Sequence, residues 1–236
     1  MLLLPTGYGK SLCYFSAAGV LEGLTVVVCP LIALVDDQHM QASSGGLQAC
    51  KLHSGMHERD QRRSLARIWS SARAPLASHQ RASRAFATVA HCQDELASTS
   101  DPAADTDPAL ASVLDVLVVT PERLLGSKAL RAALCALHRR RLLARIVVDE
   151  AHVLSRWGTD FRPALLMMGQ IRVHWPDVPI IAASATATPS VAREIQDCLQ
   201  LGADGRRTRV AASASARRNL HLSVQLRVSS PRDLPS

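Results

Sequence analysis

Short apolar runs rich in valine and isoleucine recur along this chain, and each ends at or just before a proline or a polar residue. They lie at Thr25–Cys29, Asp115–Thr120, Arg145–Asp149 and Ile180–Ala183. Runs of this length and composition predict strands that are buried on both faces. Segments of helical length lie between or after them, at Leu12–Leu21, Leu31–Gln41, Lys128–Leu137, Pro163–His174 and Pro189–Leu201. Strands that alternate with helices predict an α/β fold, a parallel sheet flanked by helices on both faces.

Weaker segments complete the expected organisation. Leu2–Leu4 is an apolar strand stub, Ala49–Leu52 is a short candidate strand, and Leu220–Val228 is strand-like. We expect a single domain over residues 1–204, followed by a tail rich in arginine and serine over residues 205–236.

The composition changes between Arg59 and Asp107, where alanine, serine, arginine, histidine and aspartate dominate without a sustained apolar period. We predict an insertion over about residues 59–112 that is helical at Asp60–Ala72. A basic arm that contacts DNA is the alternative interpretation, although its arginines alternate with alanines and have no aromatic partners.

The charge balance favours a polyanionic partner. Lysine and arginine number 27 against 20 aspartates and glutamates, which gives a net charge of +7 and a pI near 9.5. Nucleic acid is favoured over a membrane surface, and no run approaches the ~18 apolar residues of a membrane span. The cysteines form no CxxC pair, and Cys13, Cys29 and Cys135 lie in apolar surroundings, so we expect reduced core thiols and a reducing compartment.

A glycine-rich stretch follows the first strand stub and opens a helix. The residues expected to bind a nucleotide there are Thr6, Gly7, Tyr8, Gly9, Lys10 and Ser11. Glycines let backbone N–H groups approach phosphate oxygens, Lys10 supplies positive charge to the β- and γ-phosphates, and the Ser11 hydroxyl suits Mg²⁺. The strict GxxxxGK[ST] pattern fails because Leu4 stands at its first glycine. A glycine-rich turn with a chance lysine is the alternative.

Two adjacent carboxylates, Asp149 and Glu150, end a buried strand. Acids at the carboxyl end of a parallel strand lie at the ligand-binding edge of the sheet. There Asp149 can hold Mg²⁺, and Glu150 can polarise a water against the γ-phosphate. Taken alone, the pair would fit a helix N-cap better. Together with Lys10 and Ser11, it completes a set for metal-assisted hydrolysis of a phosphoanhydride.

Ser184, Thr186 and Thr188 follow the strand at Ile180–Ala183. Small hydroxyl residues at this place could relay between a nucleotide site and another surface. The alternative is a plain loop in which Thr188 caps the helix that begins at Pro189.

Six motifs, in order, resemble those of RecQ-type DNA helicases of superfamily 2. The matching segments are Pro5–Tyr14 (motif I), Cys29–Leu34 with Asp37 and Gln38 (motif Ia), Val119–Leu124 (motif Ib), Asp149–His152 (motif II), Ser155–Pro163 (the aromatic-rich loop) and Ser184–Thr188 (motif III). Arg217–Leu220 resembles the family's entry into a second motor domain. The resemblance implies a RecA-like domain of the P-loop NTPase class.

The resemblance also implies a function: an ATP-dependent DNA helicase that moves 3′→5′, with ATP and Mg²⁺ as cofactors. DNA, single-stranded or with a 3′ overhang, is the implied partner, and DNA repair and recombination in the nucleus of a eukaryote (otherwise the cytoplasm) are the implied setting. In the family, motif Ia contacts the DNA backbone. The aromatic-rich loop couples DNA binding to hydrolysis, and here Trp157 and Phe161 offer faces for base stacking while Arg162 can reach a phosphate. Ser184 and Thr186 are expected to share this coupling. No feature indicates an oligomeric state.

Departures from the family pattern leave alternatives open. Thr159 replaces the usual histidine of the aromatic-rich loop, and Val153 replaces a common cysteine. An adenine-reading glutamine upstream of motif I and a second motor domain with its arginine finger are expected to be missing, as in a truncated motor. Loss of the finger would slow hydrolysis by about 10³–10⁵-fold, so a non-catalytic module that binds nucleotide or DNA is the second hypothesis. A P-loop kinase or transporter ATPase is disfavoured, because the function of neither class requires an aromatic-rich loop such as Trp157–Arg162.

Overall fold

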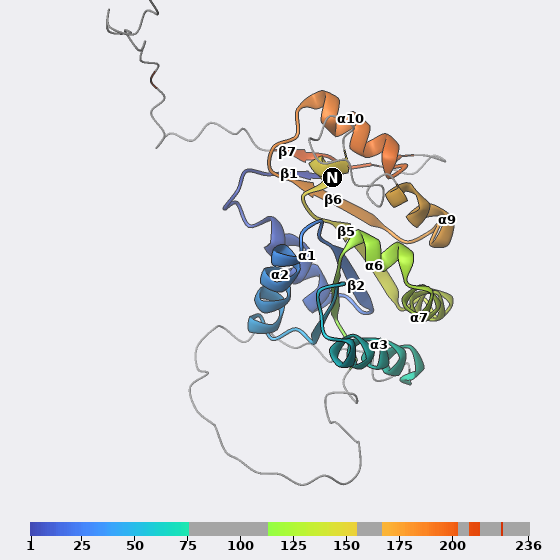
Figure 1. Ribbon diagram of the computed structural model, residues 1–236. Coiled ribbons are helices and arrows are strands. Elements are labelled where there is room, and N and C mark those ends of the chain that lie inside the picture. The colour runs from blue at the N-terminus through green and yellow to red at the C-terminus, as the bar shows by residue number, and fades with distance from the viewer. Residues whose placement is uncertain (76–112, 155–166, 203–207, 213–222, 224–236) are drawn as a thin grey trace, which may run out of the picture.

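The computed structural model (Figure 1) describes residues 1–75, 113–154, 167–202, 208–212 and 223. The aromatic-rich loop with Trp157, Phe161 and Arg162 lies outside these residues, as do all but one residue of the strand-like run Leu220–Val228 and most of the expected insertion.

The described residues build a seven-stranded sheet in the order β3-β4-β2-β5-β6-β1-β7. The strands are β1 (Leu2–Leu3), β2 (Leu24–Val28), β3 (Ala49–Leu52), β4 (Val116–Val119), β5 (Leu143–Val148), β6 (Ile180–Ser184) and β7 (Ala211–Ala212). Every neighbouring pair is parallel. The predicted parallel sheet is therefore confirmed. The two-alanine strand β7 was not predicted, because two exposed small residues carry no strand pattern.

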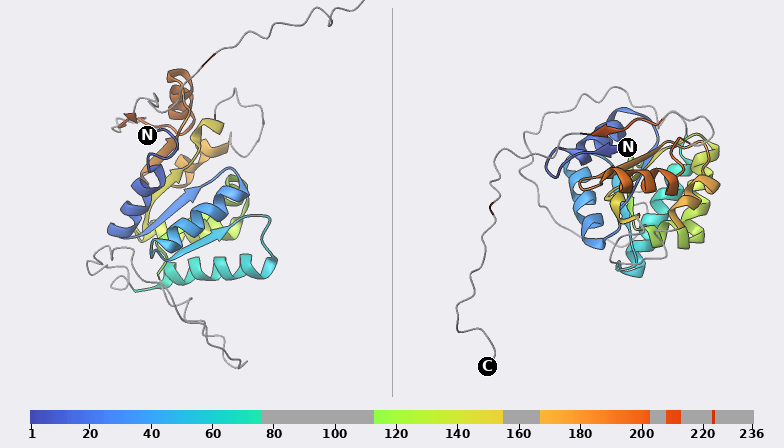
Figure 2. Two further views of the ribbon diagram at one scale, coloured as in Figure 1. Left: turned by 90° about the vertical axis from the view of Figure 1, so that its left-hand side faces the viewer. Right: turned by 90° about the horizontal axis from the view of Figure 1, so that it is seen from above.

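Helices cover both faces of the sheet. They are α1 (Lys10–Val20), α2 (Ile32–Ser44), α3 (Glu58–Arg73), α6 (Pro121–Gly126), α7 (Lys128–Arg139), α9 (Ile171–His174) and α10 (Pro189–Cys198), with 3-10 turns η1 (Ala151–Leu154) and η2 (Met167–Gln170). Figures 1 and 2 show α1 and α2 on one side of the sheet and α3, α6 and α7 on the other. Among the described residues, no helix is long and apolar enough to cross a membrane.

Each central strand contributes side chains to two hydrophobic cores, one on each face. In β2, Val26 and Val28 pack in the core that includes α3 and α7. The alternating residues Val27 and Cys29 pack in the core formed with α1 and α2. Because both faces are buried, these strands read as unbroken apolar runs in the sequence.

The helix expected at Asp60–Ala72 is present as α3 and belongs to the main core. Its residues Ile68 and Ala72 are buried there, and α3 packs on α7. This part of the compositionally distinct stretch is therefore integrated into the domain. The boundaries of the insertion and of the domain remain predictions.

Two local expectations differ from the structure. One helix was expected over Pro163–His174. Its described part is instead a 3-10 turn over Met167–Gln170 followed by the short helix α9 over Ile171–His174. Gly169 there lies so close to α10 that an added Cβ would come within 2.8 Å of the Cys198 carbonyl oxygen. Pro121 was expected only to stop a strand, but it also begins the short helix α6, where its fixed φ is favourable.

The expectation about the cysteines was partly wrong. Cys13 is exposed because it lies on the outward side of α1, whereas Cys29 and Cys50 are buried. Cys135 is only partly buried.

Candidate nucleotide site

The phosphate-binding loop (Thr6–Ser11) connects β1 to α1. Gly7 and Gly9 have φ values of 85° and 77°. An added Cβ would find space at both positions, so it is the left-handed backbone that favours glycine there. Thr6 to Gly9 are exposed, and α1 begins at Lys10, directly after the left-handed Gly9. The first N–H groups of this helix therefore face the loop, which suits an anion.

Lys10 extends back across the base of the loop. Its Nζ donates a hydrogen bond to the Leu4 carbonyl oxygen over 3.1 Å. The ammonium group is only partly buried, so it can exchange this neutral acceptor for a phosphate oxygen.

The strand order explains how distant segments meet at this site. β6 lies between β5 and β1, and all three are parallel, so their carboxyl ends share one edge of the sheet. The loop follows β1, Asp149 follows β5, and Ser184 ends β6. The Leu4 N–H donates to the Ser184 carbonyl oxygen over 3.2 Å, which holds the start of the loop against β6.

A buried hydroxyl, Tyr14 Oη, joins the phosphate-binding loop to the acidic pair. It lies 3.1 Å from Ser11 Oγ, 3.2 Å from Asp149 Oδ2 and 2.8 Å from Gln38 Oε1. The Gln38 Nε2 amide donates to Ser11 Oγ over 3.2 Å. We call Ser11, Tyr14, Gln38 and Asp149 the buried polar network. Its hydrogen bonds fix the hydroxyl and the carboxylate that were predicted as metal ligands.

The surroundings disfavour negative charge in the absence of a cation. Burial raises the pKa of Asp149, and the neighbouring Glu150 carboxylate raises it further. Burial raises the pKa of the Tyr14 hydroxyl, and the negative charge of Asp149 raises it further. Burial also raises the pKa of the Cys29 thiol, and the charges of Asp149 and Glu150 add to this effect. Both groups therefore stay neutral. A bound cation would offset the cost of ionising Asp149.

Glu150 has a left-handed backbone, with φ of 48°, which is unusual for a residue other than glycine. Its N–H donates to Asp149 Oδ1 over 3.0 Å. The Glu150 Oε2 atom lies 3.2 Å from His152 Nδ1, and that same nitrogen lies 3.2 Å from Ser184 Oγ. Ser184 Oγ also accepts the Thr186 N–H over 3.3 Å. His152 therefore links the acidic pair to the segment after β6.

The donor set fits Mg²⁺ bound together with a nucleotide. Mg²⁺ commonly takes one or two protein oxygens and completes its shell with phosphates and water. Ser11 Oγ and the Asp149 carboxylate would supply those oxygens. Within the described residues, no group of three or more His, Cys, Asp or Glu side chains could hold a metal unaided.

The structure thus brings together the predicted residues Lys10, Ser11, Asp149 and Glu150 around one edge of the sheet. Ser184 is fully buried, so its side chain can connect neighbouring segments through hydrogen bonds but cannot contact DNA directly. The sequence predicted no part in the nucleotide site for Tyr14, Gln38 and His152. Their positions inside the quoted motifs were the only signal available. Gln38 was grouped with motif Ia, which is expected to contact the DNA backbone, but its side chain is buried in the polar network.

A parallel sheet with a glycine-rich loop after one strand and an acidic pair after another defines a P-loop NTPase. The sequence profile described as "DEAD/DEAH box helicase" matches residues 76–195, which include Asp149, Glu150 and Ser184. The chain belongs to the DEAD/DEAH box helicase family.

The similar proteins include RecQ-like helicases, as the motifs predicted. The chain is 35% identical over 202 residues to the RecQ-like DNA helicase blm-1 of Caenorhabditis elegans, covering 85% of this chain and 16% of the relative. It is 34% identical to the ATP-dependent DNA helicase Q-like 4B of Arabidopsis thaliana, covering 85% of this chain and 14% of the relative. The chain therefore spans a small part of the length of these relatives.

A solved structure supports the fold. The DUF1998 helicase MrfA, crystallised bound to DNA, superposes with a TM-score of 0.51 at 14% identity, covering 90% of this chain and 24% of that one.

Proposed function

We propose that this chain is the ATP-binding, DNA-contacting first motor domain of a RecQ-type helicase that hydrolyses ATP with Mg²⁺ and moves 3′→5′ along DNA. The observation that carries the proposal is the buried polar network, in which Tyr14 joins Ser11 of the phosphate-binding loop to Asp149, 135 residues beyond Tyr14 in the sequence. Such a connection would hold the Ser11 hydroxyl and the Asp149 carboxylate in place for binding Mg²⁺ together with the nucleotide.

The residues divide the chemistry of hydrolysis among them. The loop N–H groups and Lys10 would hold the β- and γ-phosphates and neutralise charge that develops between them. Ser11 and Asp149 would hold Mg²⁺, which polarises the γ-phosphoryl group when bound. Glu150 would orient the attacking water, and the contact of its Oε2 atom with His152 Nδ1 at 3.2 Å would restrict the position of the carboxylate.

DNA, single-stranded or with a 3′ overhang, is the proposed partner. The net positive charge and the names of the relatives, which are DNA helicases, support it. The segment Cys29–Leu34, at the carboxyl end of β2, would contact the DNA backbone. Trp157, Phe161 and Arg162 would couple DNA binding to ATP hydrolysis at the nucleotide site. Because the relatives come from eukaryotes, we propose the nucleus as the compartment and DNA repair or recombination as the process.

The test is ATP hydrolysis by the purified chain with and without single-stranded DNA. Stimulation by DNA supports the proposal. Undetectable hydrolysis under both conditions, together with intact nucleotide binding, would favour the alternative of a non-catalytic nucleotide- or DNA-binding module.

The nucleotide site is tested separately with a fluorescent ATP analogue. Lys10→Ala should lower its affinity at least tenfold, because a charge-assisted contact to phosphate is lost. Lys128→Ala, which removes an exposed lysine at the start of α7, is the matched control. Equal affinity in the two variants would refute the assignment of the loop.

A further inference from the structure

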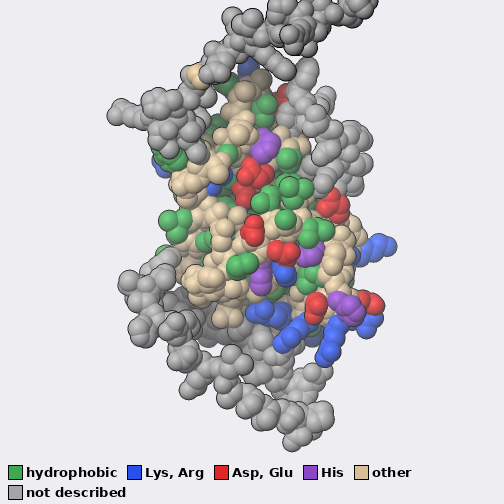
Figure 3. All heavy atoms as spheres, turned by 60° about the vertical axis from the view of Figure 1, so that its left-hand side comes forward, with side chains coloured by type: hydrophobic (Ala, Val, Ile, Leu, Met, Phe, Trp, Pro, Cys, Tyr) green, Lys and Arg blue, Asp and Glu red, His purple; other side chains and the backbone are tan. Residues whose placement is uncertain are grey.

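Helix α2 leads from the segment proposed to contact DNA to the buried polar network. Its start is at the surface, where Leu31, the N-cap, is 49% exposed and Ile32 is 42% exposed. Figure 3 shows the side of the molecule on which Figure 1 places α1 and α2, and hydrophobic side chains are exposed there beside acidic ones. Gln38 lies six residues after Ile32, about 9 Å along the helix axis, and its side chain is buried. A single helix therefore spans the distance between the two sites.

Both ends of the Gln38 amide bind residues of the nucleotide site. Its Nε2 donates to Ser11 Oγ over 3.2 Å, and its Oε1 accepts from Tyr14 Oη over 2.8 Å. Ser11 is one of the two residues predicted to hold Mg²⁺, and Tyr14 Oη lies 3.2 Å from Asp149 Oδ2 of the other. Gln38 therefore connects α2 directly to one predicted metal ligand and, through Tyr14, to the second.

The Ser11 oxygen can accept only a limited number of contacts. A serine hydroxyl has two lone pairs, and two groups, Gln38 Nε2 and Tyr14 Oη, lie within hydrogen-bond distance of this oxygen. Cation binding by Ser11 Oγ would leave one lone pair for these two groups. Engagement of Ser11 therefore changes which donors its oxygen can accept, and the donor on α2 is one of them.

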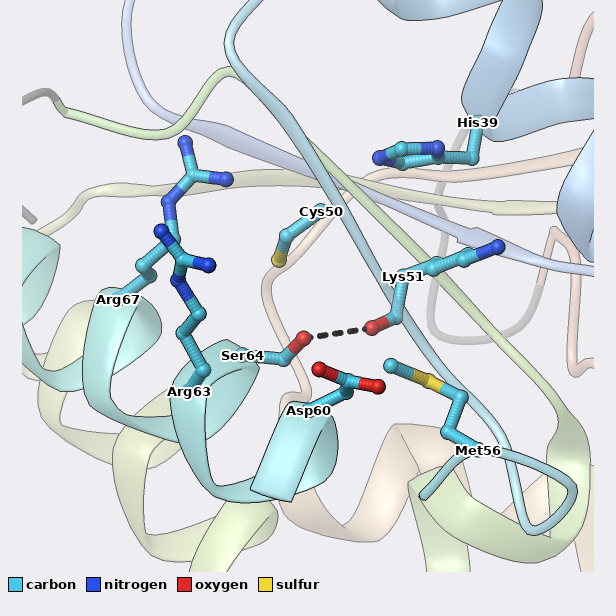
Figure 4. Close-up of a pocket in the computed structure, with 8 residues that line it drawn as sticks. All are labelled: His39, Cys50, Lys51, Met56, Asp60, Arg63, Ser64 and Arg67. Atoms are coloured by element: carbon cyan, nitrogen blue, oxygen red, sulfur yellow. Dashed lines mark hydrogen bonds between the residues drawn. The ribbon is translucent and has the colours of Figure 1, made fainter. Parts of the chain in front are cut away.

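Another side of α2 is less closely packed. His39 extends from α2 into a cavity of about 220 Å³, which is also lined by Cys50 and Lys51 of β3 and by residues of α3 (Figure 4). Asp36 Oδ1 pairs with Lys51 Nζ across 2.6 Å, but both side chains are partly exposed, so water screens this attachment. A helix beside a cavity can shift without compressing close-packed neighbours. The buried hydrogen bonds of Gln38 therefore hold α2 on one side while space remains on another.

Attachment of α2 to α1 without any functional link is the competing explanation. A buried amide requires hydrogen-bond partners, and Ser11 and Tyr14 provide them. This explains why Gln38 is hydrogen-bonded, but it does not explain why a polar residue is buried at this position. Val35 and Ala42, which are also buried on α2, attach the helix through the apolar core alone. An apolar residue at position 38 would do the same without contacting the predicted metal ligand.

We propose that Gln38 couples DNA binding at the start of α2 to the binding of Mg²⁺ with nucleotide, as a positioning residue that acts through Ser11. The inference rests on the proposed function in one respect, that the segment Cys29–Leu34 contacts DNA. DNA bound there biases the position of α2 and, through the Gln38 amide, the orientation of the Ser11 hydroxyl. Linked binding free energies are reciprocal, so nucleotide bound with Mg²⁺ changes the affinity for DNA by the same factor.

The experiment measures the affinity of the whole chain for fluorescently labelled single-stranded DNA in three states: without nucleotide, with a saturating non-hydrolysable ATP analogue and EDTA, and with the saturating analogue and Mg²⁺. The coupling factor is the ratio of the DNA affinities in the third and first states, in whichever direction it departs from one. Because both affinities come from the same variant, a uniform loss of DNA binding cancels.

Gln38→Leu is the main variant, and Gln41→Leu, on the exposed side of the same helix, is the matched control. Tyr14→Phe separates coupling from damage to the metal site, because it removes the Tyr14 hydroxyl but keeps the hydrogen bond from Gln38 Nε2 to Ser11. Thermal unfolding shows whether each variant keeps its fold. Gln38→Met, which retains the length of the side chain, replaces Gln38→Leu if the leucine variant is unfolded.

The wild type and Gln41→Leu should show a coupling factor of about fivefold or more, and the state with EDTA should show a smaller one. Gln38→Leu should lose most of the factor, whereas Tyr14→Phe should keep most of it. A wild-type factor in Gln38→Leu would overturn the inference, and so would equal losses in Gln38→Leu and Tyr14→Phe. A factor of one in a wild-type chain that binds DNA also overturns it but leaves the proposed function standing. A wild-type chain that binds no DNA contradicts the proposed function, and the inference with it.

Discussion

Tyr14 connects three residues from different parts of the chain through one hydroxyl group. Ser11 lies one turn away on α1, Gln38 is on α2, and Asp149 follows β5. A phenylalanine at this position would keep the ring, which packs edge-on against Phe15 with centroids 4.8 Å apart, and would remove only the oxygen. Tyr14 is therefore a positioning residue that can be tested without emptying the core.

Tyr14→Phe should weaken Mg²⁺-dependent nucleotide binding more than metal-free binding. The Tyr14 hydroxyl has one proton to donate, so its loss leaves one acceptor, Gln38 Oε1 or Asp149 Oδ2, without that hydrogen bond. The cost is about 1–3 kcal/mol, or roughly 5- to 150-fold in affinity. The measurement is ATP-analogue binding with Mg²⁺ and with EDTA. Gln38→Leu should reproduce the effect, whereas Gln41→Leu, on the exposed side of α2, should not. Equal losses with and without the metal would indicate a purely structural role.

Asp149→Asn should stabilise the metal-free chain at neutral pH. Burial raises the pKa of Asp149 in the folded state, so the folded chain binds this proton more tightly than the unfolded chain does. Stability contributed by Asp149 is therefore lost as the pH rises from its ordinary value of 3.8 through the raised value. The asparagine avoids this loss and should raise the melting temperature by about 2–4 °C for each kcal/mol.

The advantage of Asp149→Asn should narrow as the pH falls toward 4, and Mg²⁺ with ATP should reverse it. Thermal unfolding at several pH values provides the measurement. Glu194→Gln, an acid on the half-exposed side of α10, is the control. An Asp149→Asn variant that is less stable than the wild type at every pH would contradict the prediction.

Site residues could be predicted from the sequence where the motif that marks them lies in one short stretch of the chain. Lys10 and Ser11 follow glycines in one short stretch, and Asp149 and Glu150 follow one strand, so each group was recognisable on its own. The contact between Tyr14 and Asp149 depends on the fold, because only the strand order places α1 beside the end of β5. A buried tyrosine within an apolar helix otherwise resembles any other core residue.

At the scale of elements, the central strands were predictable because burial on both faces leaves an unbroken apolar run. The ends of elements followed local rules where a capping residue was present. Thr188 was considered as the cap of the helix at Pro189, and its side chain does accept the Val191 N–H over 3.4 Å. The 3-10 turn at Met167–Gln170 had no such signal, since it depends on the close contact between Gly169 and α10.

Thr188→Ala should lower the free energy of unfolding by about 0.5–2 kcal/mol, because the start of α10 loses its capping oxygen. Urea denaturation followed by circular dichroism would measure it. Thr188→Ser keeps the oxygen and should stay within a few tenths of a kcal/mol of the wild type. If the serine and alanine variants lose the same stability, the cap contributes little and the effect comes from the threonine methyl group.

At the scale of the whole molecule, the nucleotide site is assembled from both ends of the domain. β1 comes from the first residues of the chain, yet it pairs with β6 and β7, which come from the last third. The Met1 ammonium donates to the Arg209 carbonyl oxygen, and the Ala211 N–H donates to the Met1 carbonyl oxygen over 2.9 Å. Anything that binds the loop after β1 should therefore stabilise the fold as a unit.

Mg²⁺ with ATP should consequently raise the melting temperature of the chain. A ligand at one hundred times its dissociation constant contributes about 2.7 kcal/mol, which corresponds to roughly 5–10 °C for a domain of this size. ATP with EDTA should give a smaller shift, because Asp149 then keeps its desolvation cost. Lys10→Ala should lose most of both shifts, whereas Lys128→Ala should keep them. Identical shifts for ATP in the presence and absence of the metal would mean that the buried carboxylate does not take part in nucleotide binding.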